Sequence, residues 1–290
     1  RFGWDCHGLP VEAEMEKTIG VSGHSRIIEY GVGKFNEECR SIVLRYTSEW
    51  KKAITRTGRW VDFENGYRTM DKNYMESVWW VFKTLYEKGL IYEGYNVLPY
   101  SPKLASPLSN MEVSLGGYKD VVDQAVTVRF KIDGTENSYF LAWTTTPWTL
   151  PSNLALAVGP EIEYVEVEDE ADGAHYYLAS NLLGKYWKDG KGCRILRTVK
   201  GNDLVGMTYE PLFPYFASLK EKGAFQVVTA DYVTVEDGCG IVHTASGFGE
   251  DDYNTMKAKV PGCPVVCPVD EECRFTSEVP EWEGVFVKDA

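Results

Sequence analysis

Basic residues are scarce in this chain, and long apolar stretches are missing from it. The 290 residues include 30 Lys and Arg against 43 Asp and Glu, a formal net charge of −13. This balance excludes a globally basic nucleic-acid-binding protein, although it leaves room for a local basic contact with RNA. No apolar run reaches the roughly 18 to 20 residues that a membrane-spanning helix needs, so we expect no membrane association. Residues 1–5 lack an initiator Met and a signal-peptide pattern, which predicts a fragment of a longer chain.

Cysteine shows no sign of a disulfide framework. The seven cysteines are odd in number and widely spread, which favours a reducing compartment and predicts a cytoplasmic protein. Cys263, Cys267 and Cys273 follow a C-x3-C-x5-C spacing with no histidine nearby. A structural zinc site needs four ligands, so we predict no zinc at this cluster.

The acidic excess is confined to one part of the chain. Residues 1–117 carry equal numbers of basic and acidic side chains, whereas residues 118–290 carry the whole net charge of −13. Two domains of different character are the simplest cause. The acidic part also contains a basic strip, formed by Lys185, Lys188, Lys191, Arg194, Arg197 and Lys200. This strip either faces RNA or is an ordinary solvated surface.

Two patterns of hydrophobicity follow each other along the chain. Apolar residues at spacings of three and four predict helices over 33–57 and 72–88, with short apolar runs around them, which is an α/β pattern. After a loop at 101–117 that is rich in Pro, Ser and Gly, alternating residues predict a β-rich module. Its predicted strands are 126–131, 139–143, 164–168, 175–178, 225–228 and 240–243, with helical pattern only at 180–187 and 251–259.

Three segments combine polar side chains unusually, and the first is GWDCHGLP at residues 3–10. It places Cys6 beside His7, and such a pair can supply a nucleophile. Sequence neighbours point in different directions, however, and no third orienting group is evident. Asp5, just before a helical run, either holds an ammonium group or caps the turn.

The second segment, WTTTPWTLPSN at residues 143–153, holds five hydroxyl residues and an Asn within ten positions. Hydroxyls and amides can hold a water molecule and donate to a polarised carbonyl. A Thr-rich strand end is the alternative, because Thr favours strands. The prolines predict a sharp turn here.

The third segment, at residues 238–253, runs from a strand ending in His243 through a Gly-rich loop to the acidic residues Asp251 and Asp252. A lone histidine at a strand end is commonly structural. Acidic residues at a helix start commonly serve as caps. Too few ligands lie nearby for a metal site.

Together and in this order, the three segments resemble isoleucyl-tRNA synthetases, which are class I aminoacyl-tRNA synthetases, in the form found in the eukaryotic cytosol. GWDCHGLPVE is similar to a motif of the family's catalytic domain, WTTTPWTLPSN to the Thr-rich region of its editing domain, and GIVHTASGFGEDDY to that domain's His-to-Asp segment. The resemblance covers essentially the whole chain, and valine and leucine relatives differ at the first two motifs. It implies an α/β protein with a partial Rossmann-type nucleotide-binding domain at 1–117 and an inserted, β-rich, barrel-like editing domain at 118–290.

The resemblance also assigns residues to two sites. It implies a catalytic set in the editing domain, consisting of Thr144, Thr145, Thr146, His243 and Asp252. Asp252 would hold the α-ammonium of a valyl group. His243 would exclude isoleucine by its bulk, and a second role implied for it is to help place the attacking water. The implied substrate-binding residues are Thr149, Asn153 and Trp143 for editing, and Asp5 for the amino group of isoleucine in the synthetic site. No covalent nucleophile is implied, so Cys239 would be structural, and Ser246 stands where bacterial members usually have Pro.

The implied activity is isoleucine–tRNA ligation driven by ATP with Mg²⁺, together with hydrolysis of mischarged Val-tRNA, which needs no cofactor. A second site is needed because one methylene gains only about 1–3 kcal/mol in an apolar pocket, a value known from this enzyme class itself. Two ATP motifs of the family are absent, so only part of the synthetic site is expected here. Residues 98–103 lack the Cys pair of bacterial relatives, so no zinc is predicted there.

The partners implied are the tRNA for isoleucine, whose 3′ end enters the editing site, with isoleucine, ATP and mischarged valine. A multi-synthetase assembly would form through domains outside this sequence. The alternative is a non-catalytic module that binds a tRNA end or a protein.

Overall fold

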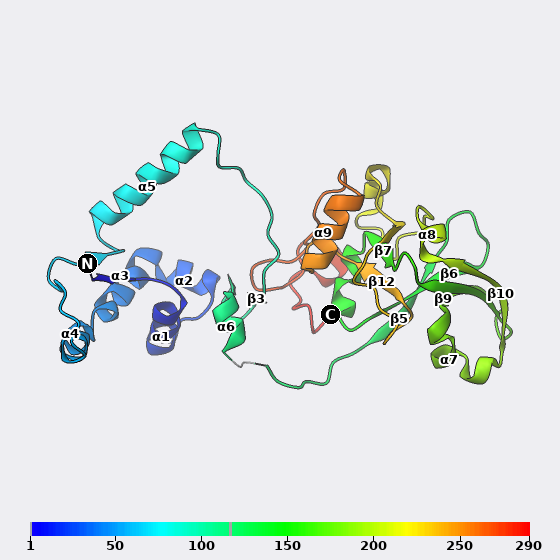
Figure 1. Ribbon diagram of the computed structural model, residues 1–290, viewed down its shortest axis with the longest axis horizontal. Coiled ribbons are helices and arrows are strands. Elements are labelled where there is room, and N and C mark those ends of the chain that lie inside the picture. The colour runs from blue at the N-terminus through cyan, green and yellow to red at the C-terminus, as the bar shows by residue number, and fades with distance from the viewer. Residues whose placement is uncertain (1, 116–117) are drawn as a thin grey trace. The chain divides into compact units, whose positions relative to one another are not determined.

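A computed structural model describes residues 2–115 and 118–290 of the chain (Figure 1). The chain divides into two compact units, Arg1–Tyr95 with Tyr100–Pro107, and Asn96–Pro99 with Leu108–Ala290. The predicted boundary after residue 117 falls at a position outside the described residues, so the division at 117/118 stays a prediction. None of the described helices is long and apolar enough to cross a membrane.

The first unit is mainly helical. Its helices are α1 (Leu9–Ile19), α2 (His24–Tyr30), α3 (Val32–Val43), α4 (Thr47–Arg56) and α5 (Lys72–Glu87). Two-residue strands form two pairs, with β1 (Gly3–Trp4) parallel to β2 (Tyr67–Arg68) and β3 (Tyr100–Ser101) antiparallel to β4 (Ser106–Pro107). The prediction of a helix over 72–88 is confirmed by α5.

The prediction of one continuous helix over 33–57 is wrong, because α3 and α4 are separated by a turn at Leu44. The Thr47 hydroxyl donates to the Leu44 carbonyl over 3.0 Å, and the Arg45 amide donates to Ile42 in a tightened turn. Such local bonds compete with the helical ladder. The apolar spacing continues across the break, so it does not reveal where the ladder is interrupted.

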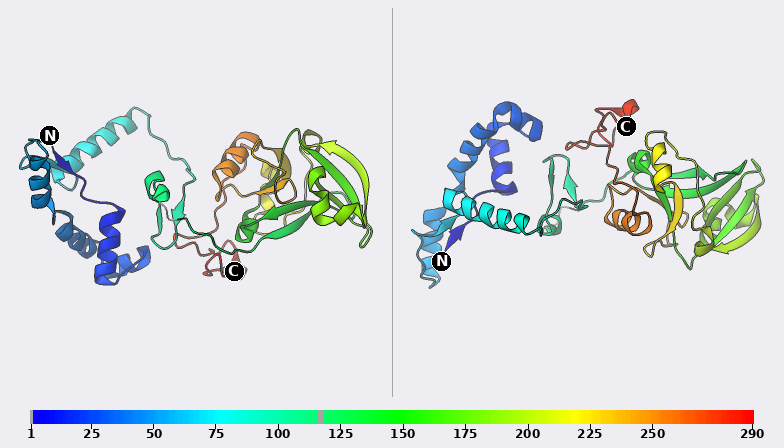
Figure 2. Two further views of the ribbon diagram at one scale, coloured as in Figure 1. Left: turned by 60° about the horizontal axis from the view of Figure 1, so that its bottom comes forward. Right: turned by 90° about the horizontal axis from the view of Figure 1, so that it is seen from above.

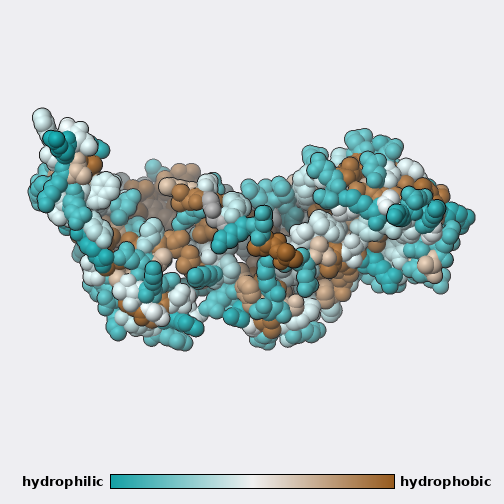
Figure 3. Space-filling model, turned by 90° about the horizontal axis from the view of Figure 1, so that it is seen from below, coloured by the Kyte–Doolittle hydropathy of each residue, from teal (hydrophilic) through white to brown (hydrophobic). Residues whose placement is uncertain are grey.

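The apolar face predicted for α5 is exposed in the structure. No residue of α5 is buried, and Trp79 keeps 68% of its surface accessible. The buried apolar residues of this unit are few, namely Cys6, Met15 and Phe35. Apolar patches also interrupt the polar surface in Figure 3. The helix pattern therefore identified an apolar stripe without identifying a packing partner.

The second unit contains two sheets (Figures 1 and 2). The five-stranded sheet has the order β10-β8-β9-β6-β5, and only β6 and β9 are parallel neighbours. Its strands are β5 (Val126–Lys131), β6 (Ser138–Thr144), β8 (Glu163–Asp169), β9 (His175–Ala179) and β10 (Cys193–Lys200). The three-stranded sheet places β7 (Ala155–Val158) between the parallel β11 (Gln226–Thr229) and the antiparallel β12 (Ile241–Thr244). Neither sheet, over the strands described, closes into a barrel.

Short helices lie before, between and after these strands. They are α6 (Asn110–Ser114), α7 (Leu183–Tyr186), α8 (Gly201–Leu204) and α9 (Glu250–Lys259), with 3₁₀ helices η1 (Pro147–Ser152), η2 (Ser180–Leu182), η3 (Lys188–Gly190), η4 (Ala217–Lys222) and η5 (Pro280–Trp282). The mixed α/β character and all six predicted strands are confirmed, with ends shifted by at most a residue or two. The prediction missed β7 and β10. The former is a four-residue apolar run, fully buried and without the alternation used to find strands.

One core joins the two sheets. It combines Phe130 and Phe140 of the larger sheet with Leu156, Val227 and Ile241 of the smaller one, all of them buried. Tyr164 of β8 is buried in the same core, and its hydroxyl has a partner on each side. The Gly159 amide donates to this hydroxyl over 2.9 Å, and the hydroxyl donates to the Gly240 carbonyl over 2.7 Å.

Replacing Tyr164 by Phe should therefore destabilise the second unit. The variant leaves a buried amide and a buried carbonyl without their partner, at a cost of about 1–3 kcal/mol. Urea titrations followed by hydrogen exchange of β8 and β12 peptides would measure the change. Tyr139→Phe is the control, because Tyr139 is only partly buried and its ring stacks on Tyr176. Equal stability of the two variants would contradict this role.

Candidate functional site

The polar residues of the second and third segments meet where β6 ends and β7 begins, beside β12. Pro147 opens η1 and Pro151 lies inside it, so the chain turns sharply between the two strands. The register of β12 on β7 sets His243 opposite Leu156. The Leu154 amide donates to the Thr244 carbonyl over 3.0 Å, which holds the end of η1 against β12.

His243 lies at the centre of this site, with both ring nitrogens in hydrogen bonds. Its Nε2 is 2.7 Å from the Thr149 hydroxyl, and its Nδ1 is 3.1 Å from the Asn153 amide nitrogen. The side chain is buried, at 7% exposure. Burial lowers the pKa of His243 to about 4, so the ring is neutral at physiological pH.

The threonines form a second layer around this ring. The Thr149 hydroxyl donates to the Thr146 carbonyl over 2.8 Å, and the Thr146 amide donates to the Thr144 hydroxyl over 3.0 Å. Thr144 and Thr149 are buried, whereas Thr145 and Thr146 are exposed. Trp143 is partly buried and packs beside Gly238, where an added Cβ would lie 3.1 Å from the indole ring. Thr145 and Thr146 are therefore the exposed threonines of this turn, and the Thr146 hydroxyl also lies 3.2 Å from the Thr144 hydroxyl.

Asp252, near the start of α9, is linked to the same strand by one hydrogen bond. The Ala245 amide donates to its Oδ2 over 3.0 Å, and the Tyr232 hydroxyl lies 3.5 Å from its Oδ1. Burial raises the pKa of the Asp252 carboxyl, and these two hydrogen bonds oppose the shift. Within the described residues no Lys, Arg or His forms an ion pair with it. The site thus contains a partly buried carboxylate without a counter-ion.

Other residues singled out by the sequence lie elsewhere. Asp5 is exposed in the first unit, between β1 and α1, and the neighbouring Cys6 amide donates to Thr69. Cys239 is a buried thiol that donates to the Leu141 carbonyl, and burial raises its pKa to about 11, so it is not a reactive thiolate. Over residues 2–115 and 118–290, no three His, Cys, Asp or Glu side chains gather as metal ligands would.

The basic strip is largely neutralised by acidic partners within the unit. On β10, Arg194 pairs with Glu168, Arg197 with Glu166 and Lys200 with Glu163, and each of these partners is on β8. Lys185 pairs with Asp237. These pairs favour the solvated-surface alternative for the strip over a free positive face.

Two tyrosines at the site were missed by sequence reasoning. The buried Tyr209 donates from its hydroxyl to Asn153 Oδ1 over 2.6 Å, and Tyr232 lies against Asp252. Tyr209 lies outside the three segments that the sequence singles out. Its partner is 56 positions away in sequence, and no local spacing can predict such a contact.

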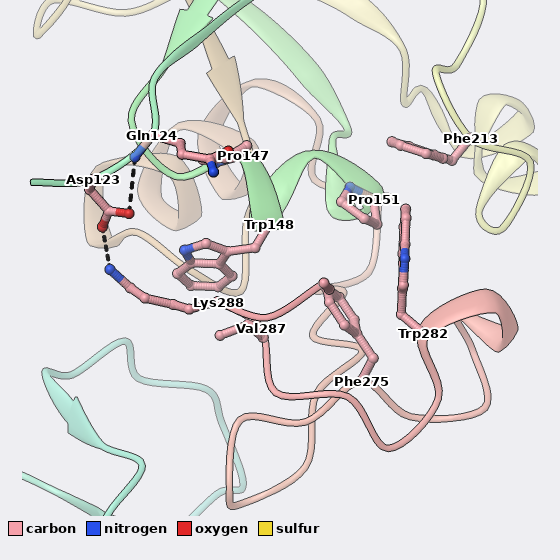
Figure 4. A pocket seen from close by; sticks show the side chains of 11 residues that line it. Asp123, Gln124, Pro147, Trp148, Pro151, Phe213, Phe275, Trp282, Val287 and Lys288 are labelled. Atoms are coloured by element: carbon pink, nitrogen blue, oxygen red, sulfur yellow. Dashed lines mark hydrogen bonds and ion pairs between the residues drawn. The ribbon is translucent and has the colours of Figure 1, made fainter.

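A separate pocket of about 220 Å³ lies in the same unit (Figure 4). Pro147, Trp148 and Pro151 of η1 line it together with aromatic residues that include Phe275 and Trp282. Lys288 and Asp123 form an ion pair at this pocket. Since Thr149 of the same helix contacts His243, η1 contributes to both the pocket and the polar site.

The chain is similar to known proteins over its whole length. A family model for class I tRNA synthetases (I, L, M and V) matches residues 1–263. The whole chain is 53% identical to an isoleucine–tRNA ligase of Treponema denticola, 56% to one of Protochlamydia amoebophila and 49% to the cytoplasmic one of Saccharomyces cerevisiae. Bacterial and eukaryotic relatives thus match to a similar degree, so the eukaryotic cytosolic type stays a prediction.

This chain covers 29%, 28% and 27% of those three relatives, less than a third of each. Among solved structures, GlLeuRS-CP1 is similar over 46% of this chain and 59% of its own, with a TM-score of 0.39 and 16% identity. The editing domain of the Plasmodium falciparum cytosolic leucyl-tRNA synthetase is similar over 42% of this chain and 46% of its own, with a TM-score of 0.36 and 18% identity. The family model covers well over half of the chain, and on that ground the chain belongs to the class I tRNA synthetases of the I, L, M and V group.

Proposed function

We propose that this chain is part of an isoleucine–tRNA ligase and that its second unit hydrolyses valine from mischarged tRNA. Relatives with that name match over the whole chain at 49–56% identity. The carrying observation for the editing proposal has two parts. The ring of His243 is neutral and held at both nitrogens, and the Asp252 carboxylate forms no ion pair with any Lys, Arg or His in residues 2–115 and 118–290. In this proposal residues 1–117 are part of the catalytic domain and residues 118–290 are the editing domain.

Asp252 has the properties of an ammonium-binding group. A partly buried carboxylate is costly without a partner, and an incoming α-ammonium would supply a charge-assisted hydrogen bond. The amide of Ala245 holds one carboxylate oxygen in place. Among the residues that the structure describes, the other oxygen has the distant Tyr232 hydroxyl as its hydrogen-bond partner, which leaves it able to accept from a ligand.

His243 has the properties of a wall and not of a proton acceptor. Both ring nitrogens are engaged by protein groups, and burial lowers the ring's pKa to about 4, so it has no free lone pair for a water molecule. A ring held at two points cannot move aside, and forcing an extra methylene against it costs about 1–3 kcal/mol. We infer that His243 excludes isoleucine in this way.

The exposed hydroxyls of Thr145 and Thr146 are the groups that would orient the attacking water and the ester. Thr144 supports this turn through its bond to the Thr146 amide. Trp143 is proposed to contribute to the site for the terminal adenosine of tRNA. Thr149 and Asn153 are buried and bonded to His243, so they are proposed to support that site indirectly, by holding the ring. Asp5 is proposed to bind the amino group of isoleucine in the synthetic site.

The ligation reaction of the whole enzyme would use ATP and Mg²⁺, and its partners would be isoleucine and its tRNA, in the cytoplasm. The residues described here do not gather into a metal-binding cluster, so no step is assigned to the ion. Assembly with other synthetases would involve other parts of the enzyme.

We further propose a barrel-like arrangement for the second unit. Residues 207–210 support it, because they bridge the two sheets. Ile132, next to β5, pairs with Tyr209, and Thr208 pairs with Gln226 of β11.

The chain should remove valine from the tRNA for isoleucine faster than it removes isoleucine from the same tRNA. The expected ratio is about 10- to 200-fold, the range that one methylene supports. Release of labelled amino acid from each tRNA, compared with the spontaneous rate, measures it. Equal rates on both would refute the exclusion role of His243. No hydrolysis above background would favour the binding-module alternative.

Asp252→Asn should lower kcat/KM for Val-tRNA hydrolysis by about 10- to 100-fold, because a hydrogen bond to a charged group is worth about 1.5–3 kcal/mol. Asp251→Asn is the matched control, since Asp251 is its exposed neighbour. In the wild type, hydrolysis should fall as acidification protonates Asp252, at a pH above the usual carboxyl range because burial raises its pKa. The assignment fails if both variants behave alike.

The depressed pKa of His243 also predicts a pH-dependent stability. The folded value of about 4 lies below the ordinary 6.5, so the unfolded chain binds the proton more tightly. The resulting stability is complete above pH 6.5 and is lost as the pH falls towards 4. Between about pH 7.5 and about pH 4.5 this loss is about 2–3 kcal/mol.

His243→Gln should remove that part of the pH dependence. Unfolding free energies of the wild type and the variant, measured at both pH values, provide the test, and only the difference between pH values matters. An identical pH dependence in the two proteins would show that His243 titrates normally in the folded state.

A further inference from the structure

Tyr209 has no role in the functions proposed above, yet its ring, backbone and hydroxyl are all held by contacts. Its ring is buried and packs edge-on against Phe130 and Phe225, with centroids 5.3 and 6.0 Å away. Its amide donates to the Phe225 carbonyl over 3.0 Å, and its backbone pairs with Ile132. The Tyr209 hydroxyl therefore sits at a fixed point in the core, 2.6 Å from Asn153 Oδ1.

The orientation of the Asn153 amide is unambiguous. Its nitrogen lies 3.0 Å from the Ala155 carbonyl, which can only accept, so this end of the amide must be NH₂. The oxygen then faces Tyr209, whose hydroxyl must donate. Burial raises the pKa of Tyr209 well above its usual range, so this proton is retained.

The same logic fixes the proton on His243. The second amide hydrogen of Asn153 points at Nδ1, which must accept, so the neutral ring carries its proton on Nε2. Nε2–H then donates to the Thr149 hydroxyl, and that hydroxyl donates a hydrogen bond to the Thr146 carbonyl. The hydrogen bonds run in one direction from Tyr209 to the exposed turn at Thr146.

We propose that Tyr209 is a positioning residue for the editing site, which acts through Asn153 to hold His243 in its Nε2–H form and to hold the turn that carries Thr145 and Thr146. This inference rests on the proposed editing function. Tyr209 lies behind Asn153 and does not touch the substrate. Its loss should therefore change the rate of the chemical step more than the binding of the tRNA.

The test compares Tyr209→Phe with the wild-type chain in two measurements. ¹H–¹⁵N correlation spectra of labelled histidine show which nitrogen of His243 carries the proton. Deacylation kinetics on Val-tRNA separate kcat from KM. We expect the wild type to show only the Nε2–H form. In the variant Asn153 Oδ1 has lost its donor, so only the bond to the Ala155 carbonyl still opposes a turned amide. We therefore expect a mixture of tautomers, with a fall of about fivefold to tenfold in kcat at unchanged KM.

Tyr164→Phe is the matched control, because it also removes a buried tyrosine hydroxyl that has two partners, but neither partner belongs to the site. It should leave the His243 tautomer and kcat unchanged. Asn153→Asp is a second variant, which retains Tyr209 and provides a test even if the Tyr209→Phe protein does not fold. Its carboxylate cannot donate to Nδ1, so we expect the proton of His243 to move to that nitrogen.

The outcomes separate the two proposals. A pure Nε2–H form in Tyr209→Phe overturns the positioning role of Tyr209, whatever Asn153→Asp shows, as does a kcat loss equal to that of Tyr164→Phe. A pure Nε2–H form in Asn153→Asp overturns the step through Asn153. The spectra need no enzymatic activity. If the wild-type chain deacylates nothing while Tyr209→Phe still shifts the tautomer, the editing function fails and the positioning of His243 by Tyr209 stands.

Discussion

The hydrogen-bonded surroundings of His243 are the constraint on which the site depends. An imidazole buried this deeply is stable only if both nitrogens have partners, because an unpaired polar group in a low-dielectric interior is costly. Thr149 and Asn153 supply those partners over 2.7 and 3.1 Å. Meeting this need requires the sharp turn of η1 and the pairing of β12 with β7. The turn of η1 and the pairing of β12 with β7 therefore together provide the hydrogen bonds that allow His243 to be buried.

The same constraint divides the chemistry between two side chains. His243 is neutral and fully engaged, so it supplies shape, whereas Asp252 retains a carboxylate oxygen with only a distant partner and supplies charge. They are connected through one strand end, since the amide that holds Asp252 belongs to Ala245, two residues after His243. In the proposed editing site these two side chains would act as a rigid wall and an ammonium anchor.

The acidic character of the second unit has a different meaning once its partners are known. The residues of the basic strip on β10 pair with Glu163, Glu166 and Glu168 of β8. Charges facing charges along the outermost pair of strands protect an exposed sheet edge from pairing with another chain. Such exposed pairs contribute little to stability, and their mutual neutralisation leaves little field to attract a phosphate backbone. Under the editing proposal, contact with RNA therefore falls to the local geometry of the site.

By itself the sequence determined the α/β character, six strands of the second unit and helix α5, because periodicity reflects which faces are apolar. It also determined the family, since three ordered motifs occur together. Periodicity could not locate the break between α3 and α4, which is due to hydroxyl–carbonyl bonding, or find β7, which has no polar face. Only the tertiary structure decided that Tyr209 meets Asn153, that Asp252 has no cationic partner in the part of the chain that is described, and that four residues of the basic strip are paired. These are contacts between residues far apart in the chain, and their energies depend on burial and direction, which no local pattern of residues encodes.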